Sequence, residues 1–291
     1  MYHFLTATFN RHELTFKSVT DIVNQMHAMD KDYRIVIVEA GDESQLRKIF
    51  EENQYSKVEI ISVPEDTFWT SAMFIGTDNL LKKSNEGDVF AFFNNDIRIP
   101  TKTLIALTKY DFSQNIAISP ISISSNDQKS VSTGVKVLSW PFCIHRAEYL
   151  DLSVEEANLL NQTEVDFMTQ RLLLCGRHVI GQIGNYRADV LRHYGGDYEL
   201  TLRMVRNGFK VILDPTIHVY IDEVDTGLNS RYRKLTLFQR LQSLYDIKSS
   251  SNLWVAAKFS YLVAPWWSQP LNMLFMTIKA FIRAVILKPR I

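Results

Sequence analysis

The sequence has few cysteines and no excess of charge of either sign. Its 291 residues include only two cysteines, Cys143 and Cys175, which are too few for a disulfide scaffold and too far apart for a Cys-x-x-Cys site. Its 32 basic and 32 acidic residues give a formal net charge of zero, whereas proteins that bind nucleic-acid backbones usually carry a basic excess. We therefore expect a protein of a reducing compartment, the cytoplasm, that binds no nucleic acid.

Signals of several other protein classes are also absent. Residues 1–9 contain no basic leader, no long apolar run and no cleavage site, so we expect no secretion signal. Neither Gly-x-x-x-x-Gly-Lys nor Gly-x-Gly-x-x-Gly occurs, which excludes a P-loop and the common dinucleotide-binding fingerprint. If the protein binds phosphate groups, we expect a metal ion rather than a glycine-rich loop to hold them.

The first 120 residues alternate short apolar runs with helical patterns, which is typical of βαβ units and a mostly parallel sheet. Polar residues at 122–133 indicate an exposed loop, and a strand is expected at 131–138. Strands are predicted at 4–9, 34–39, 58–63, 89–93 and 116–119, and helices near 14–26, 44–52, 69–83 and after Pro100.

Helical patterns dominate from residue 154 to residue 206, and short strands are predicted at 210–213 and 217–220. From about residue 231 onward, the pattern predicts two or three helices broken by Pro265 and Pro270. We therefore predict an α/β fold in which helices flank a mostly parallel sheet. A catalytic domain at 1–230 would be followed by a helical, basic and aromatic C-terminal extension at 231–291.

Three polar residues, Asn94, Asn95 and Asp96, follow the most apolar of the predicted strands. In an open parallel sheet, ligands bind where strands end at their carboxyl edge. The side-chain oxygens of these residues suit a divalent cation that holds a diphosphate. An Asx-rich turn that merely ends the strand is an equally good interpretation of this motif alone.

Paired glycines, Gly195 and Gly196, precede a predicted helix, and Asp197 is expected at or near its N-cap. Capping alone is the simpler interpretation of that carboxylate. Glu199 lies about 200° round the helix from Asp197, so the two cannot face one site. Glu199 and Arg203 are spaced to pair on the helix surface.

Several short segments occur in one order along about residues 4–228, and the ordered set is more specific than any member. They are Thr8–Arg11, Ile35–Asp42, Phe68–Met73, Phe92–Asp96, Thr169–Arg171, Ile183–Gly184, His193–Arg203, Gly208–Phe209 and Asp214–Pro215. Together they resemble the motifs of the family 2 glycosyltransferases, particularly the rhamnosyltransferase-like branch. The resemblance implies a GT-A-like, Rossmann-type fold and an inverting transfer of a sugar from a nucleotide-diphosphate donor to a hydroxyl of a glycan or lipid-linked acceptor.

The resemblance also implies residue roles. By analogy, Asp96 binds Mg²⁺ or Mn²⁺, with Asn94 and His218 as further metal candidates. Asp197 is the general base that takes the acceptor proton, and Glu39 contacts the nucleotide base or ribose. The other donor-binding candidates are Thr8, Asn10, Arg11, Trp69, Asn95 and Arg171, and the acceptor-binding candidates are Tyr194, Gly195 and Gly196.

Three positions depart from the family pattern. Asn94 stands where an aspartate is frequent, Gly196 replaces a glutamate, and Ile221 occupies the place of a metal-binding histidine. A non-catalytic nucleotide-sugar-binding protein is therefore one alternative. A nucleotidyltransferase is a second, although residues 10–13 do not form the glycine-rich basic loop of that class.

The residues after Asp246 include no acidic side chain, but they include six lysines and arginines and three of the five tryptophans, Trp254, Trp266 and Trp267. This pattern predicts an amphipathic helix that lies in a membrane interface without spanning it. A peripheral location at the inner face of the membrane, with a lipid-linked acceptor, would follow. Packing on the catalytic domain, or pairing in a homodimer, is the alternative. The predicted apolar stripe is Leu271, Leu274, Ile278, Ile282 and Val285, flanked by Lys279 and Arg283.

Overall fold

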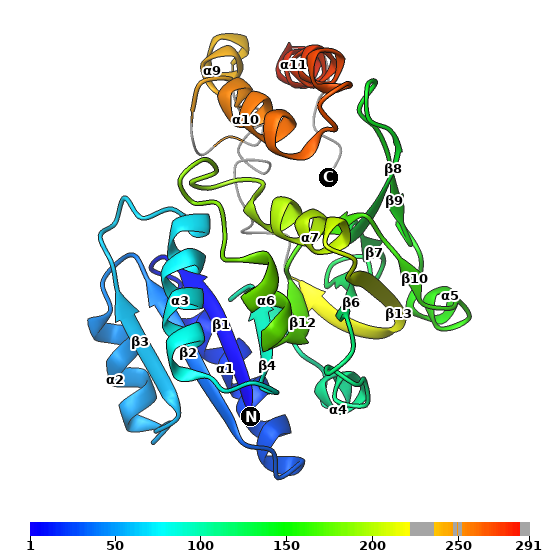
Figure 1. Ribbon diagram of the computed structural model, residues 1–291. Helices are drawn as coiled ribbons and strands as arrows, with labels where there is room; N and C mark the ends of the chain where they lie inside the picture. Colours follow the sequence, from blue (N-terminus) through cyan, green and yellow to red (C-terminus); the bar gives the residue numbers. More distant parts are fainter. Residues whose placement is uncertain (222–235, 247–248, 250–251, 286–291) are drawn as a thin grey trace.

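The computed structural model describes residues 1–221, 236–246, 249 and 252–285 (Figure 1). Within these residues, ten strands form one mixed sheet. They are β1 (Tyr2–Thr8), β2 (Tyr33–Glu39), β3 (Val58–Ser62), β4 (Val89–Phe93), β5 (Ile97–Arg98), β6 (Ile116–Ser124), β7 (Ser130–Val131), β10 (Thr163–Glu164), β12 (Leu172–Gly176) and β13 (Lys210–Ile221). Their order is β10-β13-β6-β12-β4-β1-β2-β3, with β5 paired to β13 and β7 to β6.

Helices cover both faces of this sheet, as the alternating patterns of the sequence predict (Figure 1). Successive strand residues point to opposite faces, so Phe4 and Phe93 join one core cluster while Leu5 and Phe92 join the other. The α/β fold with a mostly parallel, helix-flanked sheet is therefore confirmed. One face carries α1 (His12–Ala28), α2 (Ser44–Glu52) and α4 (Thr103–Leu107), and the other carries α3 (Trp69–Lys83), α6 (Arg177–Ile183) and α7 (Gly196–Arg206).

β12 corrects the expectation that helices dominate residues 154–206. This strand is fully buried and pairs antiparallel with both β4 and β6 in the middle of the sheet. A short, continuous apolar run such as Leu172–Gly176 has no period that separates a central strand from a buried helix. Two further strands, β10 and β11 (Phe167–Met168), lie in the same range, and a short helix, α5 (Val154–Asn158), begins it.

The polar segment 122–133 is not simply an exposed loop. β6 continues to Ser124, and β7 returns beside it, so Ser122 and Ser130 are buried. The hydroxyl of Ser130 donates to the carbonyl of Tyr149 (2.5 Å) and accepts from the amide of Leu152 (2.8 Å). Ser130 can therefore occupy a buried strand position because its hydroxyl is hydrogen-bonded.

The two strands predicted at 210–213 and 217–220 are one strand, β13, which runs parallel to β6. Its register shifts between Asp214 and His218, around Pro215. Proline has no amide hydrogen to donate to the sheet. The gap between the two predicted strands is therefore a local irregularity at Pro215 and not the end of a strand.

The C-terminal helices are α9 (Leu237–Gln242), α10 (Leu253–Val263) and α11 (Gln269–Val285). They lie beyond α7, beside a hairpin of β8 (Gly134–Ser139) and β9 (Ile144–Glu148) that forms the small sheet with β11 (Figure 1). Pro265 separates α10 from α11 as expected. Pro270 instead lies in the first turn of α11, where proline is tolerated because the amide there needs no helical partner. The predicted boundary at 230/231 lies outside the described residues.

Candidate active site

The loops after β1 and β2 are locked together at the carboxyl edge of the sheet. Asn10 turns the chain into α1 with a φ of 51°, and its Oδ1 accepts from the amide of Asp42 (3.0 Å). Gly41 lies so close that a Cβ there would be 2.2 Å from Asn10 Oδ1. The predicted donor-binding Asn10 therefore shapes this edge, and its side-chain oxygen is engaged by the neighbouring loop.

Glu39, at the end of β2, is completely buried. Its Oε1 accepts from the amides of Asn10 (3.1 Å) and Gly41 (2.7 Å), whereas its Oε2 has no hydrogen-bond partner among the described residues. Burial raises the pKa of this carboxyl, and the two amide hydrogen bonds oppose that rise. A buried, unpaired carboxyl oxygen is costly unless a ligand satisfies it.

Thr8 and Asn95, two further donor-binding candidates, lie inside the structure. The side-chain amide of Asn95 donates to the hydroxyls of Thr8 (2.7 Å) and Thr15 (3.0 Å), and all three residues are buried. These bonds tie the turn after β4 to the end of β1 and the first turn of α1. Thr8 and Asn95 therefore help to position Arg11 and Asp96, which follow them in the sequence.

Arg11 and Asp96 come together as an ion pair, with 3.1 Å between Arg11 Nη1 and Asp96 Oδ2. The Asp96 side chain is only 10% exposed, while that of Arg11 is 34% exposed. Burial raises the pKa of Asp96, and the nearby guanidinium groups of Arg11 and Arg171 oppose this rise. The structure thus places one carboxylate and two cations at the end of β4.

The third metal candidate, His218, is not part of this group. Its Nε2 donates to the carbonyl of Pro215 (2.9 Å), and burial lowers the pKa of its imidazole. On β13 it is Ile221 that pairs with Ile97, the residue after Asp96, so His218 lies about 10 Å further along the strand. A ring that donates to the backbone in this way acts as a structural group.

No cluster of three or more His, Cys, Asp or Glu side chains suited to a metal ion occurs among the described residues. A single carboxylate nevertheless fits Mg²⁺ or Mn²⁺, because such ions take most of their ligands from water and from a diphosphate. Asp96 would supply that carboxylate. Asn94 lies two residues earlier, and its backbone N–H donates to the carbonyl of Arg171 (3.0 Å).

The segment before α7 is docked against the start of α3. Thr70 Oγ1 donates to the carbonyl of His193 (2.8 Å), and the Trp69 amide donates to His193 Nδ1 (3.4 Å). Gly195 is the N-cap residue with a φ of 85°, which only glycine adopts readily. A Cβ on Gly196 would lie 2.5 Å from Thr70 Oγ1, so this close approach also requires glycine.

Asp197 therefore lies in the first turn of α7, two residues beyond the N-cap residue Gly195 and so near the N-cap, as expected. Its Oδ1 accepts from the amide of Tyr198 (2.9 Å). Burial raises the pKa of Asp197 to about 6, although the backbone amides of Tyr198 and Gln170 and the cation of Arg171 work in the opposite direction. A carboxylate with a pKa near 6 is charged at neutral pH and can accept a proton there.

Arg171 connects the two halves of the site. Its charge opposes the rise that burial causes in the pKa of both Asp96 and Asp197, so it lies near both carboxyl groups. It comes directly before β12, and its Nη1 donates to the carbonyl of Ser132 (3.2 Å). The structure thus brings Arg11, Asp96, Arg171 and Asp197 to one region.

The acceptor candidate Tyr194 is partly exposed, and its ring lies 4.4 Å from that of His193. Trp69 packs its ring edge on Tyr186 (5.9 Å between centroids, 89°). Sequence analysis missed Tyr186 and Gln170, whose side chains are hydrogen-bonded to each other in the interior beside Asp197. The only available signal was the place of Gln170 beside Arg171 in a matched motif.

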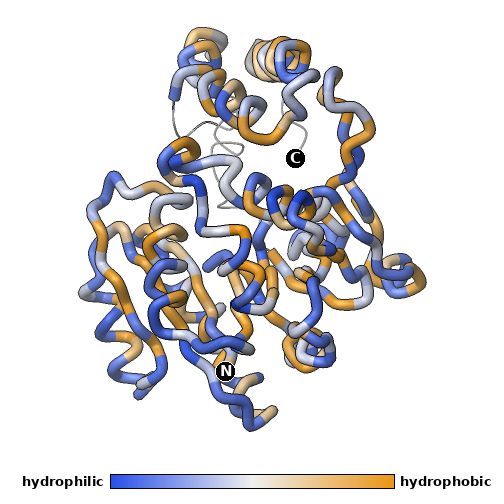
Figure 2. The backbone as a smooth tube through the Cα atoms, in the orientation of Figure 1, coloured by the Kyte–Doolittle hydropathy of each residue, from blue (hydrophilic) through white to orange (hydrophobic). Residues whose placement is uncertain are grey.

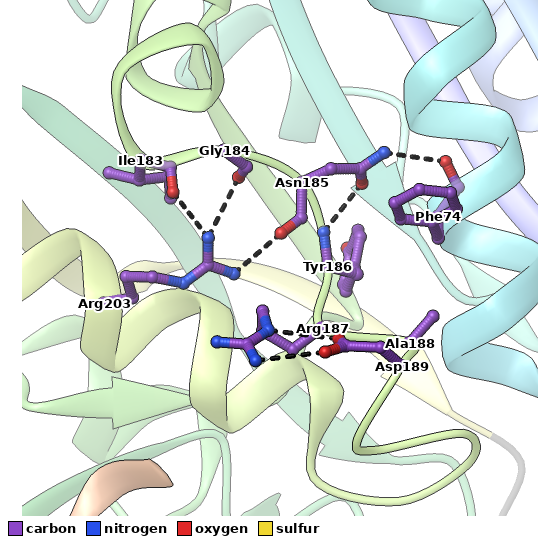
Figure 3. A pocket seen from close by; sticks show the side chains of 9 residues that line it. All are labelled: Phe74, Ile183, Gly184, Asn185, Tyr186, Arg187, Ala188, Asp189 and Arg203. Carbon is purple, nitrogen blue, oxygen red and sulfur yellow. Dashed lines mark hydrogen bonds and ion pairs between the residues drawn. The ribbon is translucent and has the colours of Figure 1, made fainter.

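Glu199 and Arg203 do pair, but not on the surface as expected. Glu199 is only 6% exposed and binds the guanidinium of Arg203 through both oxygens (2.8 and 2.9 Å). Arg203 also donates to the carbonyls of Ile183, Gly184 and Asn185 (Figure 3). Glu199 points away from Asp197 on the helix, and this direction is inward. There the Glu199–Arg203 ion pair holds the loop between α6 and α7.

That loop and Phe74 line a cavity of about 660 Å³ (Figure 3). Its polar groups bind one another: Asn185 Nδ2 donates to the carbonyl of Phe74 (2.9 Å), and Arg187 pairs with Asp189 (3.1 Å). None of the predicted site residues lines it. Tyr186, which lies beside Asp197, is nevertheless among its lining residues, so the cavity borders that part of the site.

Neither a protein-family model nor a curated protein matches the sequence. Solved structures do match. GalNAc-T7 with UDP, GalNAc and Mn²⁺ has a TM-score of 0.56 and 13% identity, and the match covers 97% of this chain but only 56% of that one. The mannosyltransferase PcManGT from Pyrobaculum calidifontis with GDP-Man and Mn²⁺ has a TM-score of 0.55 and 15% identity, covering 96% and 75%. TarS from S. aureus (residues 1–349) has a TM-score of 0.50 and 12% identity, covering 98% and 81%.

The chain has the GT-A fold. This is the fold that the sequence motifs implied, and it explains why Asp96 and Asp197 come from opposite sides of β12 to one edge of the sheet. At these identities the likeness concerns the fold alone. None of the three proteins is a rhamnosyltransferase by name, so that branch stays a prediction.

Proposed function

We propose that this protein is an inverting glycosyltransferase that transfers a sugar from a nucleotide-diphosphate donor to a hydroxyl group of a glycan or lipid-linked acceptor. The observation that carries the proposal is that two carboxylates, Asp96 and Asp197, lie in different surroundings at one edge of a GT-A sheet. Asp96 lies beside two arginines, and Asp197 has a pKa of about 6. Two proteins of the same fold were solved with UDP or GDP-Man and Mn²⁺, which supports the donor class and a hexosyl group.

The donor half would use Glu39, Arg11, Arg171 and Asp96. The unpaired Oε2 of Glu39 can accept a hydrogen bond from the base or ribose. The guanidinium groups of Arg11 and Arg171 stabilise the negative charge that grows on the diphosphate as it leaves. Asp96, together with Asn94 two residues before it, would hold Mg²⁺ or Mn²⁺, which when bound would neutralise further charge on the leaving group.

The acceptor half would use Asp197 as general base. As the acceptor oxygen forms its bond to the anomeric carbon, its proton passes to a carboxyl oxygen of Asp197, and the bond from that carbon to the diphosphate breaks. General-base assistance of this kind contributes about 10²- to 10⁴-fold to the rate. Tyr194, Gly195 and Gly196 lie directly before Asp197 and would border the acceptor.

Donor binding can be tested without knowing the acceptor. Wild-type protein and the Asp96→Asn variant are screened by thermal shift against UDP-, GDP- and dTDP-sugars, with and without Mn²⁺. One donor class at 100 times its Kd should stabilise the wild-type protein by about 2.7 kcal/mol, and the Mn²⁺-dependent part should vanish in the variant. If no nucleotide sugar stabilises the wild-type protein, the donor assignment is wrong.

A non-catalytic nucleotide-sugar-binding protein is the second candidate function. Asn94 and Ile221, which replace frequent metal ligands of the family, favour it. Such a protein would pass the binding test above and yet transfer no sugar. The raised pKa of Asp197 supports the enzyme instead, because a binding protein has no need of a carboxyl group that titrates near neutral pH.

We further propose that the C-terminal segment contacts the inner face of a membrane. Within the described residues, no helix is long and apolar enough to cross a bilayer. The exposed side of α11 carries Leu271, Leu274, Ile278 and Phe281, which are 40–52% exposed. Ile282 is partly buried, and Arg283 and Val285 lie among residues whose side chains are not described. Pairing of the exposed stripe in a homodimer is the competing proposal.

A further inference from the structure

The turn of the β8–β9 hairpin is attached to α11 by several contacts. Asn272 is only 2% exposed, and its carbonyl accepts from Cys143 Sγ (3.2 Å) while its side-chain amide donates to the carbonyl of Trp140. Asn272 Oδ1 also accepts from Ser260 of α10 (2.7 Å), and Lys279 donates to the carbonyl of Cys143. One buried side chain therefore holds the hairpin turn, α10 and α11 together.

This attachment places apolar side chains of the hairpin beside those of α11. Phe142, in the turn, is 50% exposed, and its ring meets that of Phe275 edge-on (5.3 Å between centroids, 76°). At 100° per residue, Phe275 lies about 40° from Leu271 and about 60° from Ile278 on the surface of α11. Phe142 thus lies at the border of the exposed stripe of α11, which is Leu271, Leu274, Ile278 and Phe281.

Exposed aromatic and basic side chains also occur on α10 and in the turn that follows it. Trp254, Lys258 and Tyr261 have a spacing of four and three residues, so they share one side of α10, and both aromatic rings are 67% exposed. Trp266 and Trp267, in the turn, are 83% and 59% exposed. Figure 2 shows the hydrophobic residues along these C-terminal helices.

We propose that the hairpin tip (residues 138–144) and the stripe of α11 form one docking surface for an anionic phospholipid bilayer. The inference rests on the membrane contact proposed above for the C-terminal segment and adds a part of the catalytic unit to it. Tryptophan and tyrosine favour the interface between water and lipid, and exposed lysines such as Lys258 complement anionic headgroups. No acidic residue follows Asp246, which removes the charge that would oppose this contact.

The surface also fits the proposed acceptor site. Phe259, on the inner side of α10, would touch a Cβ at Gly195 at 3.0 Å, and its ring packs on Tyr198 (6.4 Å). These contacts are within two residues of Asp197. A lipid-linked acceptor held at the bilayer would therefore present its hydroxyl group on the side of the molecule where Asp197 lies.

Co-sedimentation of the full-length chain with vesicles tests the proposal. The wild-type protein should bind vesicles of phosphatidylcholine with phosphatidylglycerol much more strongly than vesicles of phosphatidylcholine alone. Phe142→Ser and Leu274→Ser should each weaken binding about three- to tenfold. Each side chain is about half exposed, so its loss removes about half the apolar area of a large side chain from the contact with lipid. Phe142→Trp should retain binding, which separates lipid contact from damage to the hairpin.

Leu159→Ser is the matched control, since Leu159 is 85% exposed but follows α5, far from α11 (Figure 1). If Leu274→Ser weakens binding and Phe142→Ser does not, the hairpin is not part of the surface, although the tail contact stands. If the wild-type protein does not bind either kind of vesicle, both fail. If it sediments as a dimer that Phe142→Ser dissociates, the surface joins two copies of the chain. Each of these results is independent of sugar transfer.

Discussion

The carboxyl group of Asp197 has an unusually high pKa because of its surroundings. The group is withdrawn from most of the solvent, and three backbone amides (Tyr198, Asp197 and Gln170) and Arg171 compensate for only part of that loss. Burial therefore raises its pKa to about 6, from an ordinary value of 3.8. The neighbouring Asp96 meets Arg11 directly, so the two carboxylates of the site have different partners and can take different roles.

The first prediction at the residue scale concerns activity and pH. A general base works only when it is deprotonated, so kcat/KM should fall about tenfold per pH unit below pH 6 and level off above it. The profile is measured with saturating metal between pH 5 and pH 8. The Asp189→Asn variant is the control, because Asp189 is a 64% exposed carboxylate on the loop before α7. A flat profile across pH 6 would show that another group takes the proton.

The second prediction concerns stability. Because the pKa of Asp197 is higher in the folded protein than in the unfolded chain, its contribution is complete below about pH 4 and is lost as the pH rises through 6. Asp197→Asn removes the charge of this partly buried side chain and keeps an acceptor for the Tyr198 amide. We expect the variant to be more stable than wild type at pH 8, by at most about 3 kcal/mol, and to show no gain at pH 4. Urea unfolding at both pH values measures this, and equal differences at both would contradict it.

Part of the site could be predicted from residue types in order. Asn94, Asn95 and Asp96 follow a continuous apolar run, and paired glycines precede Asp197, so each motif has a local signal. The structure adds the contacts between residues that are far apart in the sequence. It shows Asn95 bound to Thr8 and Thr15, 87 and 80 residues away, and His218 turned to Pro215. Such partners depend on strand order, which the sequence of a single chain does not display.

At the scale of elements, the start of α7 depends on its fit against α3. Gly196→Ala would place a Cβ 2.5 Å from both Oγ1 and Cγ2 of Thr70. We expect a loss of about 1–3 kcal/mol in the free energy of unfolding and weaker activity, because Asp197 is the next residue. Thr70→Ala removes both clashing atoms, so Gly196→Ala should cost less in that background.

Urea unfolding of the two single variants and the double variant measures this coupling. Gly181→Ala is the control, since its Cβ in α6 would meet only the end of Arg177 at 3.4 Å. We expect that substitution to be neutral or slightly stabilising. Equal costs of Gly196→Ala in both backgrounds would contradict the contact between α7 and α3.

The strands show where sequence patterns lose information. β1 to β4 were predictable because each apolar run is followed by a helix with a clear period. β12 was not, since Leu172–Gly176 is apolar on both faces and sits between helical patterns. It is the antiparallel strand that separates β4 from β6 and so places Arg171 between Asp96 and Asp197.

At the scale of the whole molecule, the C-terminal segment is part of the folded unit. Phe259 and Val263 of α10 form a core cluster with Leu191, Leu202 and Phe167. We expect Phe259→Ala to cost about 3–5 kcal/mol, as for other buried phenylalanines. Tyr261→Ala, on the exposed side of the same helix, should change stability by less than about 0.5 kcal/mol. Urea unfolding of both variants measures the two changes in stability. If both changes are small, α10 does not pack on α7.

The central claim is that Asp197 removes the acceptor proton in a sugar transfer, and the most direct measurement is the turnover of Asp197→Asn. The donor found by thermal shift is incubated with a panel of glycan and lipid-linked acceptors, and kcat and donor Kd are measured for both proteins. We predict that kcat falls about 10²- to 10⁴-fold while donor Kd changes less than about threefold, since the base acts only in the transition state. A folded Asp197→Asn protein that transfers sugar at nearly the wild-type rate would contradict the account and reduce Asp197 to a partly buried residue at the start of α7.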